Sequence, residues 1–498
     1  MHHLLEQAET VRKEVGQQIS QKRKSELGQF MTPASVARFM ASLFSPSSLK
    51  KALLLDAGAG MGALSGAALD RFAAGGFHFQ HVQVVAYEID PMLRDLLSET
   101  LVKYRGRFGI DISFRRGDFI EEAVKLIFQG EERFTHAILN PPYKKIHSAS
   151  RHRFLLRRVG IETVNLYSAF VALTIELMQI GGQIVAIMPR SFCNGPYYRL
   201  FRELILGKTA IKHIHLFAAR NRAFRDDDVL QENIIMLLER DAIQRNVTIS
   251  TSTDDSFTDK ETNVYPFDRI VFSDDPERFI HIPTSPEPNR LETSAAIHCS
   301  VGDLGLEVST GPVVDFRVKP FLRQIPERGT VPLLYPGHFT GQAIDWPKLG
   351  AKKPNAVLWN VETEKWLYPA GCYVVVRRFS SKEEKRRVMA SVVCPGAFNG
   401  SRMVGFENHL NVFHSGKQGI PENLARGLAV FLNSTAVDDQ FRLFSGHTQV
   451  NATDLRLLKY PSREVLTRIG AWAKAQGELT QRKIDQKIES LLCPKMTR

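Results

Sequence analysis

The chain has 498 residues, 43% of them hydrophobic, and its 65 Lys and Arg outnumber 53 Asp and Glu to give a net charge of +12. That length and apolar share leave room for two or three globular domains with large cores. The positive charge suits a polyanionic partner such as nucleic acid, although a basic protein without such a partner would have the same composition.

Cysteine usage and the N-terminal residues exclude further classes. The 5 cysteines are scattered without a CxxC pair, so we expect neither a disulfide framework nor a metal site. The N-terminal stretch MHHLLEQAETVRKEVGQQ is charged and lacks the apolar core of a signal peptide. No apolar run reaches the roughly 18 residues of a membrane span. We therefore expect an intracellular, cytoplasmic protein without membrane contact.

The first half of the chain alternates between strand and helix patterns. Residues 4–27 indicate a polar helix, followed by the turn-like GQFMTP (28–33) and a helix through VARFMASLF. From residue 51 to about 240, short apolar runs alternate with amphipathic stretches, which predicts an α/β domain with a doubly wound, mostly parallel sheet. Strands are expected at 52–57, 82–89, 112–118, 136–141, 182–189, 211–217 and 233–239.

The alternating pattern ends near residue 245, which we take as the end of the first domain. Residues 246–290 are rich in Ser, Thr, Asp and Pro and predict a connector, with room for a little β structure. Residues 291–465 contain short strands, turns and many aromatic and basic residues, which indicates a second, α+β domain. The tail, 466–498, is predicted to be helical and charged.

The first predicted strand runs into a glycine-rich turn, DAGAGMG, which begins at Asp56. Gly58, Gly60 and Gly62 remove side chains where a ligand must approach the backbone. Turns of this kind also bind dinucleotides or nothing, so the turn alone does not identify the ligand. It contains no basic residue and no Lys-Ser/Thr pair follows it, which favours a cofactor with a sulfonium and a carboxylate over a nucleotide phosphate.

Acidic residues at the ends of the next two strands fit such a ligand. Glu88, followed by Ile89, is placed to accept hydrogen bonds from two ribose hydroxyls. Asp118 can accept from an adenine amino group while Phe119 covers the ring. Asp118 could equally cap the following helix, and that alternative stays open.

The fourth strand ends in Asn140-Pro141-Pro142-Tyr143, the most informative feature of the chain. The prolines fix the backbone and remove two N–H donors, so the acceptors that remain are the Asn140 side-chain carbonyl and the Pro141 backbone carbonyl. Together they can hold both hydrogens of an NH2 group, localise the nitrogen lone pair and aim it at a sulfonium methyl. Tyr143 would stack on the ring that carries the amine. A proline-rich turn without chemistry is the alternative.

In this order, GQFMTP, DAGAGMG, YEID, GDF and NPPY, followed by a large basic region, the sequence resembles the gamma class of DNA adenine-N6 methyltransferases. The resemblance implies a class I, Rossmann-like catalytic domain that binds S-adenosylmethionine, and a C-terminal target-recognition domain. It also implies that Phe30 and Thr32 contact the methionine part of the cofactor, and that Asp56, Ile89 and Asn140 belong to the cofactor-binding residues as well. Phe224, within NRAFRDDDVLQENIIMLL, would stack with Tyr143 on an adenine flipped out of double-stranded DNA.

The stretch 431–461 resembles more narrowly the PstI/BsuBI-type modification methylases of restriction–modification systems. This resemblance suggests CTGCAG as the target and a separately encoded restriction endonuclease as a partner. The sequence departs from the family where DAGAG lacks the proline that often follows the aspartate. The glycines are kept, so the departure puts little in doubt.

DNA would lie on a basic groove between the domains and be held mainly through its phosphates. One group of candidate contacts follows the catalytic turn in KKIHSASRHRFLLRR, and a second group, in the C-terminal domain, can reach base edges. The candidates are Lys144, Lys145, Arg151, Arg153, His338, Arg377, Arg378, His447, Gln449 and Asn451. The basic run could equally be a solvated helix face, and His447 and Asn451 could be turn residues.

Other functions remain open. An RNA or protein-glutamine amino-methyltransferase would use the same NPPY chemistry, and a catalytically inactive DNA-binding homologue would keep the fold. A fused nuclease is disfavoured, because we find no convincing PD…(D/E)xK arrangement.

Overall fold

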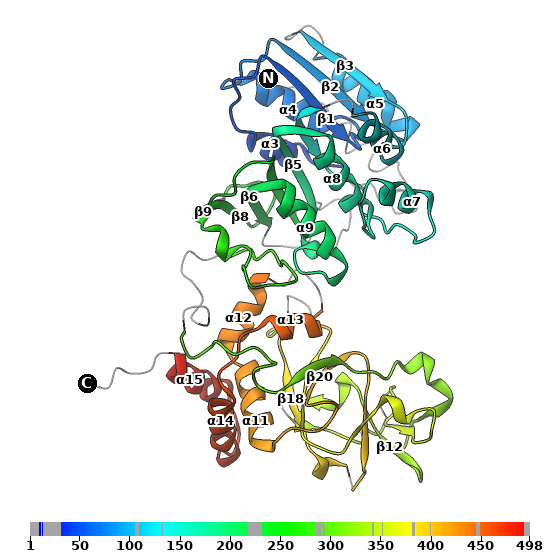
Figure 1. Cartoon of the computed structure of the whole chain (residues 1–498), viewed down its shortest axis with the longest axis vertical. Helices are drawn as coiled ribbons and strands as arrows, with labels where there is room; N and C mark the ends of the chain where they lie inside the picture. The colour runs from blue at the N-terminus through cyan, green and yellow to red at the C-terminus, as the bar shows by residue number, and fades with distance from the viewer. Residues whose placement is uncertain are drawn as a thin grey trace, which may run out of the picture. The chain divides into compact units, whose positions relative to one another are not determined.

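The computed structural model describes residues 9, 10, 12, 31–104, 109–130, 133–217, 232–283, 291, 294–340, 343–350, 352–380, 384–398, 400–444 and 449–492. The chain forms two compact units, Met1–Pro286 and Glu287–Arg498 (Figure 1). No helix within the described residues is long and apolar enough to cross a membrane.

A nine-stranded sheet forms the centre of the first unit, in the order β3-β2-β1-β4-β5-β7-β6-β8-β9. Strands β3, β2, β1, β4 and β5 run parallel, β7 runs antiparallel between β5 and β6, and β9 is antiparallel to β8 at the edge. The strands are β1 Lys51–Ala57, β2 His81–Tyr87, β3 Ile110–Arg115, β4 Phe134–Leu139, β5 Met178–Pro189, β6 Thr209–Phe217, β7 Asn233–Arg240, β8 Val247–Ser252 and β9 Glu261–Tyr265.

Apolar side chains alternate between the two faces of this sheet. Leu54 joins the core beneath α3, α4 and α5, whereas Leu55 joins the core beneath α6, α8 and α9, because successive side chains of a strand point to opposite faces. The predicted doubly wound, mostly parallel α/β sheet is therefore confirmed. The helices are α3 Ala34–Ser42, α4 Ala63–Ala73, α5 Pro91–Val102, α6 Phe119–Gln129, α7 Arg151–Arg158, α8 Leu166–Leu177 and α9 Arg199–Lys208.

The strand order reverses between β1 and β4. The chain leads from β1 through β2 to β3 on one side and from β4 to β5 on the other. Doubly wound sheets bind ligands at such a switch point, outside the carboxyl ends of the strands. The glycine turn after β1 and Asn140 after β4 both lie there.

The segment predicted as a connector, 246–290, instead contributes two strands to the first sheet. Strand β8 pairs in parallel with β6, and β9 pairs with β8. The Ser-rich composition was misleading because Ser250 is buried against histidines, 2.7 Å from His213 Nε2 and 2.8 Å from His215 Nδ1. The first unit consequently extends to Pro286 and not to 245.

The second unit has the α+β character that the sequence predicts. An antiparallel sheet, β10-β20-β17-β18, and a mixed sheet, β11-β15-β12-β19-β16, are accompanied by a short pair, β13-β14. Its strands are β10 Glu307–Thr310, β11 Leu322–Arg323, β12 Thr330–Leu334, β13 Phe339–Thr340, β14 Ala343–Ile344, β15 Ala356–Leu358, β16 Leu367–Pro369, β17 Tyr373–Arg377, β18 Ala390–Val393, β19 Met403–Phe406 and β20 Leu410–His414.

Helices of the second unit form one core with the antiparallel sheet. The helices are α11 Glu422–Leu432, α12 Thr435–Phe444, α13 Ala452–Leu457, α14 Arg463–Ala475 and α15 Gln481–Leu492. Leu466 of α14 and Ile488 of α15 belong to the same core as Val374 of β17. The tail, 466–498, is therefore part of this unit where it is described and not a separate segment.

The expectation that no cysteines pair is wrong for Cys372 and Cys394. They form a disulfide with Cα atoms 4.2 Å apart. Tyr373 and Val393 face each other in the antiparallel pair of β17 and β18, so the two cysteines are the next positions along the same ladder. A separation of 22 residues gives no sign of this register.

Candidate active site

A pocket opens at the carboxyl ends of β1 to β4. Of the residues predicted to contact the cofactor, the following line it: Thr32, Gly58, Gly60, Glu88, Ile89, Asp118, Phe119 and Asn140. Pro142 also lines the pocket. Residues separated by up to 110 positions in the chain thus meet in one place, as expected at a switch point.

The glycine turn has the backbone conformation that requires glycine. Gly58 and Gly60 have φ angles of 84° and 56°, which lie in the left-handed region that side chains disfavour. The N–H of Gly58 donates to the Tyr87 carbonyl at 3.0 Å. Gly62 serves packing instead of the pocket, since a Cβ there would lie 2.9 Å from Leu97 Cδ1 of α5.

Asp56, predicted to contact the cofactor, is fully buried and bonds to the start of α4, the helix that follows the glycine turn. Its Oδ2 accepts hydrogen bonds from the Ser65 backbone N–H at 3.1 Å and from Ser65 Oγ at 2.6 Å. Burial raises the pKa of Asp56 to about 7. The prediction is corrected accordingly, because Asp56 holds the start of α4 and does not line the pocket.

Glu88 lines the pocket and is held by two backbone donors. Its Oε2 accepts from the Gly60 N–H at 2.8 Å, and its Oε1 accepts from the Asp90 N–H at 2.7 Å. Burial raises the pKa of Glu88 above its usual value, against the effect of these donors. The side chain is therefore fixed in the wall of the pocket, next to the glycine turn.

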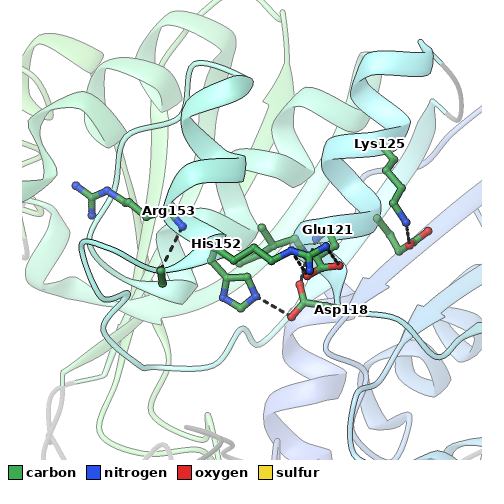
Figure 2. Close-up of polar contacts among 9 residues, drawn as sticks. Asp118, Glu121, Lys125, His152 and Arg153 are labelled. Atoms are coloured by element: carbon green, nitrogen blue, oxygen red, sulfur yellow. Dashed lines mark hydrogen bonds and ion pairs between the residues drawn. The ribbon is translucent and has the colours of Figure 1, made fainter.

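Asp118 both caps α6 and lines the pocket, so its two expected roles are compatible. Its Oδ1 accepts from the N–H groups of Ile120 at 2.9 Å and Glu121 at 3.2 Å. Its Oδ2 lies 3.0 Å from His152 Nε2 of α7, as Figure 2 shows. Burial acts to raise the pKa of Asp118, but the hydrogen bond and charge of His152 outweigh it, and the pKa is lowered.

The catalytic turn places its asparagine against the loop before α3. Asn140 Nδ2 donates to Thr32 Oγ1 at 3.0 Å, so the amide nitrogen is turned to Thr32 and the amide oxygen points away from it. Pro141 is buried, and Tyr143 is half-buried with its ring edge-to-face against Tyr167, at 6.2 Å between centroids. Burial raises the pKa of Tyr143, so its phenol stays neutral.

Sequence reasoning missed several residues of the pocket. Phe170 of α8 packs on Phe119 with 4.9 Å between ring centroids and lines the pocket beside Gly58. Met31 and the buried Arg12 also line it. The position of Met31 between Phe30 and Thr32 was an available signal, whereas Phe170 lies in a uniformly apolar helix that offers none.

Three predicted site residues, Phe30, Phe224 and His447, lie outside the described residues.

The basic residues after the catalytic turn differ in how far their side chains are exposed to solvent. Lys144 and Lys145 are exposed. Arg151 is also largely exposed and pairs with Glu121 at 3.0 Å. Arg153 is turned inward to the Thr163 carbonyl and Glu162, with its side chain 12% exposed. The prediction that Arg153 faces DNA is therefore wrong in this structure.

Two predicted DNA contacts in the second unit have structural roles. His338 is 2% exposed, with Nδ1 accepting from the Tyr335 N–H at 3.0 Å and Nε2 lying 2.9 Å from Asn355 Oδ1. Both ring nitrogens are thus engaged within the unit, so the prediction that His338 reaches a base is corrected. Asn451 caps α13 in a capping box with Asp454, which was the alternative interpretation.

Two of the remaining candidates, Arg378 and Gln449, lie close together on the second unit. With Phe379 and His409 they form what we call the 378–409–449 cluster. Arg378 donates to the Asn408 carbonyl at 3.2 Å and lies 3.5 Å from Gln449 Oε1. Phe379, which sequence reasoning missed, is 46% exposed and packs on His409 with 4.9 Å between ring centroids. Arg377 lies alongside and donates to the Phe339 carbonyl at 2.6 Å.

The sheet order, the glycine turn after β1 and the Asn-Pro-Pro-Tyr turn after β4 define a class I methyltransferase. The solved structure described as "cryoEM structure DrdV-DNA complex" is similar in fold, with a TM-score of 0.52 and 12% identity, and the match covers 91% of this chain and 57% of that one. The family described as "Eco57I restriction-modification methylase" matches residues 94–224.

Two relatives match along nearly the whole chain. Type II methyltransferase M.BsuBI of Bacillus subtilis is 54% identical over 479 residues, which cover 95% of each chain. Type II methyltransferase M.PstI of Providencia stuartii is 42% identical over 493 residues, which cover 97% of this chain and 96% of that protein. The chain therefore belongs to the PstI/BsuBI-type DNA methyltransferases of type II restriction–modification systems.

Proposed function

We propose that this methyltransferase transfers the methyl group of S-adenosylmethionine to the exocyclic N6 of an adenine flipped out of duplex DNA. The observation that carries the proposal is the position of Asn140, at the end of β4 and in the wall of the pocket that also contains Glu88 and the glycine turn. An amide oxygen there is an acceptor for one amine hydrogen, and the adjacent Pro141 carbonyl is an acceptor for the other.

The residues of the pocket fit the proposed cofactor. Phe119 and Phe170 provide apolar surface for an adenine ring, and Asp118 at its edge is an acceptor for the amino group. Glu88, held next to the glycine turn by two backbone donors, lies in the pocket wall at the end of the second strand, where a carboxylate suits the two hydroxyls of a ribose. Arg12 also lines the pocket, and its guanidinium is paired there with Glu9 at 2.7 Å.

The chain's own residues contribute positioning and electrostatics. Thr32 orients the Asn140 amide, and Asn140 and Pro141 would hold the amine so that its lone pair is localised. Neutral Tyr143, with Phe224, would stack on the flipped base. S-adenosylmethionine supplies an electrophilic methyl group on a cationic sulfur. These contributions reduce the barrier by aligning the two reactants.

The second unit is proposed to read the DNA sequence, with residues 291–465 as the target-recognition domain. Arg377, Arg378 and Gln449 would contact bases or phosphates from the 378–409–449 cluster. Lys144, Lys145 and Arg151 would bind backbone phosphates beside the catalytic turn. A CTGCAG target, a separately encoded endonuclease and a cytoplasmic location complete the proposal.

A labelled-methyl assay tests the proposed reaction. The full-length protein is incubated with methyl-tritiated S-adenosylmethionine and, in parallel, with CTGCAG duplexes, duplexes altered at the adenine, RNA, and a glutamine-containing protein. We expect label only in duplexes that contain the adenine, recovered as N6-methyladenine after digestion. Label in cytosine, RNA or protein would contradict the proposal, as would an Asn140→Ala variant with wild-type activity.

A further inference from the structure

The helix that follows the catalytic turn touches the wall of the cofactor pocket (Figure 2). His152 of α7 lies with Nε2 3.0 Å from Asp118 Oδ2. Its neighbour Arg151 pairs with Glu121, in the first turn of α6, at 3.0 Å. Asp118 lines the pocket, whereas His152 reaches the carboxylate from α7, outside the lining.

Two sets of contacts remove the rotational freedom of the Asp118 carboxylate. The N–H groups of Ile120 and Glu121 hold Oδ1, and His152 holds Oδ2. An ionised carboxylate oxygen accepts two hydrogen bonds, so Oδ2 keeps an acceptor position for a donor inside the pocket. Without His152, only the helix cap would set the direction of the carboxylate.

We propose that His152 is a positioning residue for the cofactor: it keeps the Asp118 carboxylate turned toward the amino group of the cofactor's adenine. The inference rests on the S-adenosylmethionine cofactor proposed above. His152 adds no contact of its own to the ligand, and its effect reaches the ligand only through Asp118.

The groups around the pair act on His152 in opposite directions, with a net effect that favours its charged form. The Asp118 hydrogen bond raises the pKa of His152, burial lowers it, Asp118 and Glu121 raise it by their charge, and Arg151 lowers it, with a net rise. The side chains of His152 and Asp118 are 33% and 25% exposed. Water therefore screens the charges in part, and the hydrogen bond is the main contribution to positioning.

The test compares two ligands that differ only at the adenine amino group. Calorimetry measures the affinities of S-adenosylhomocysteine and of its purine-riboside analogue, in which a hydrogen replaces that amino group. We expect the wild type to prefer the adenine ligand by about tenfold or more, the range of one charged hydrogen bond. His152→Ala should weaken the adenine ligand about fivefold and leave the purine-riboside ligand unchanged.

Matched variants separate positioning from a loss of structure. His152→Gln retains an N–H donor near the position of Nε2 and should restore the adenine preference to within about twofold of wild type. Lys125→Ala removes an exposed ion pair with Glu122 on the same helix, at 2.6 Å (Figure 2), and should change neither affinity. In turnover assays, His152→Ala should raise KM for the cofactor and leave kcat near wild type.

Two results would overturn the inference in distinguishable ways. If the wild type binds the adenine ligand and His152→Ala keeps the full preference, or loses affinity for both ligands equally, His152 does not act through Asp118 and the cofactor proposal stands. If the wild type binds neither ligand, the cofactor proposal fails and this inference fails with it.

Discussion

Thr32 and Asn140 are 108 positions apart in the chain, and a hydrogen bond joins them beside the pocket. The donor is Asn140 Nδ2 and the acceptor is Thr32 Oγ1, at 3.0 Å. Thr32 is 7% exposed, so water cannot readily replace the lost partner. A methyl group in place of this hydroxyl would allow the amide to rotate and present its nitrogen where an oxygen is needed.

We therefore predict that Thr32→Val lowers kcat about tenfold, the effect of one misdirected polar group, with little change in KM for DNA. Thr32→Ser keeps the hydroxyl and should stay within about threefold of wild type. Single-turnover methylation of a short duplex measures the rate. Equal rates for the Val and Ser variants would mean that the hydrogen bond has no part in catalysis.

For single residues, the sequence predicted which side chains carry suitable chemical groups better than it predicted which way those side chains point. Asn140, Glu88 and Asp118 follow strand ends, and the sheet topology brings all three to one pocket. Asp56, Arg153 and His338 carry equally suitable groups, but each points into its own unit. A side chain's direction depends on partners far away in sequence, such as Asn355 for His338, and no local pattern reveals it.

Among the elements, the close crossing of α11 and α14 gives the second unit a sharp packing requirement. A Cβ at Gly470 would lie 1.6 Å from the Asn423 carbonyl oxygen, and one at Gly427 would lie 1.8 Å from the Leu466 carbonyl oxygen. Backbone atoms form both contacts, so the helices would have to separate to admit a methyl group.

We predict that Gly470→Ala destabilises the second unit by about 3 kcal/mol, although alanine favours helix in isolation. Gly477→Ala is the matched control, because a Cβ there would have no atom within 4 Å. Urea unfolding monitored through the tryptophans, Trp472 of α14 among them, measures the change. A Gly470→Ala protein as stable as the Gly477→Ala protein would show that the helices adjust freely.

The elements that sequence predicted well were those with one dominant signal. Strands β1, β2 and β4 to β7 follow apolar runs that a doubly wound sheet buries, whereas β3, at the edge of the sheet, has a single buried residue. Strand β8 was missed because its serines satisfy buried histidines. Strands such as β11 and β14 have 2 residues each, too few for any periodicity. The helices of the tail, α14 and α15, were predicted because an amphipathic pattern extends over several turns, whereas α12 and α13 were not predicted.

At the scale of the whole molecule, the two units are proposed to contact different parts of the DNA. Their contributions to DNA binding can therefore be measured separately. Lys145 of the first unit is an exposed cation beside the catalytic turn, which suits a phosphate. Phe379 of the second unit is an exposed aromatic ring supported by His409, which suits a base. Phosphate contacts act on every DNA sequence and release counterions, whereas base contacts act on the target alone.

We therefore predict different signatures for the two variants in binding assays with CTGCAG and unrelated duplexes over a range of salt. Lys145→Ala should weaken both duplexes equally and reduce the slope of log affinity against log salt by about 0.9. Phe379→Ala should weaken the target duplex about tenfold and leave the unrelated duplex and the slope unchanged. Val361→Ala, at a 91% exposed position of the second unit, is the control. If Phe379→Ala weakened both duplexes alike, the second unit would hold DNA without reading it, and the recognition role would have to lie elsewhere in the chain.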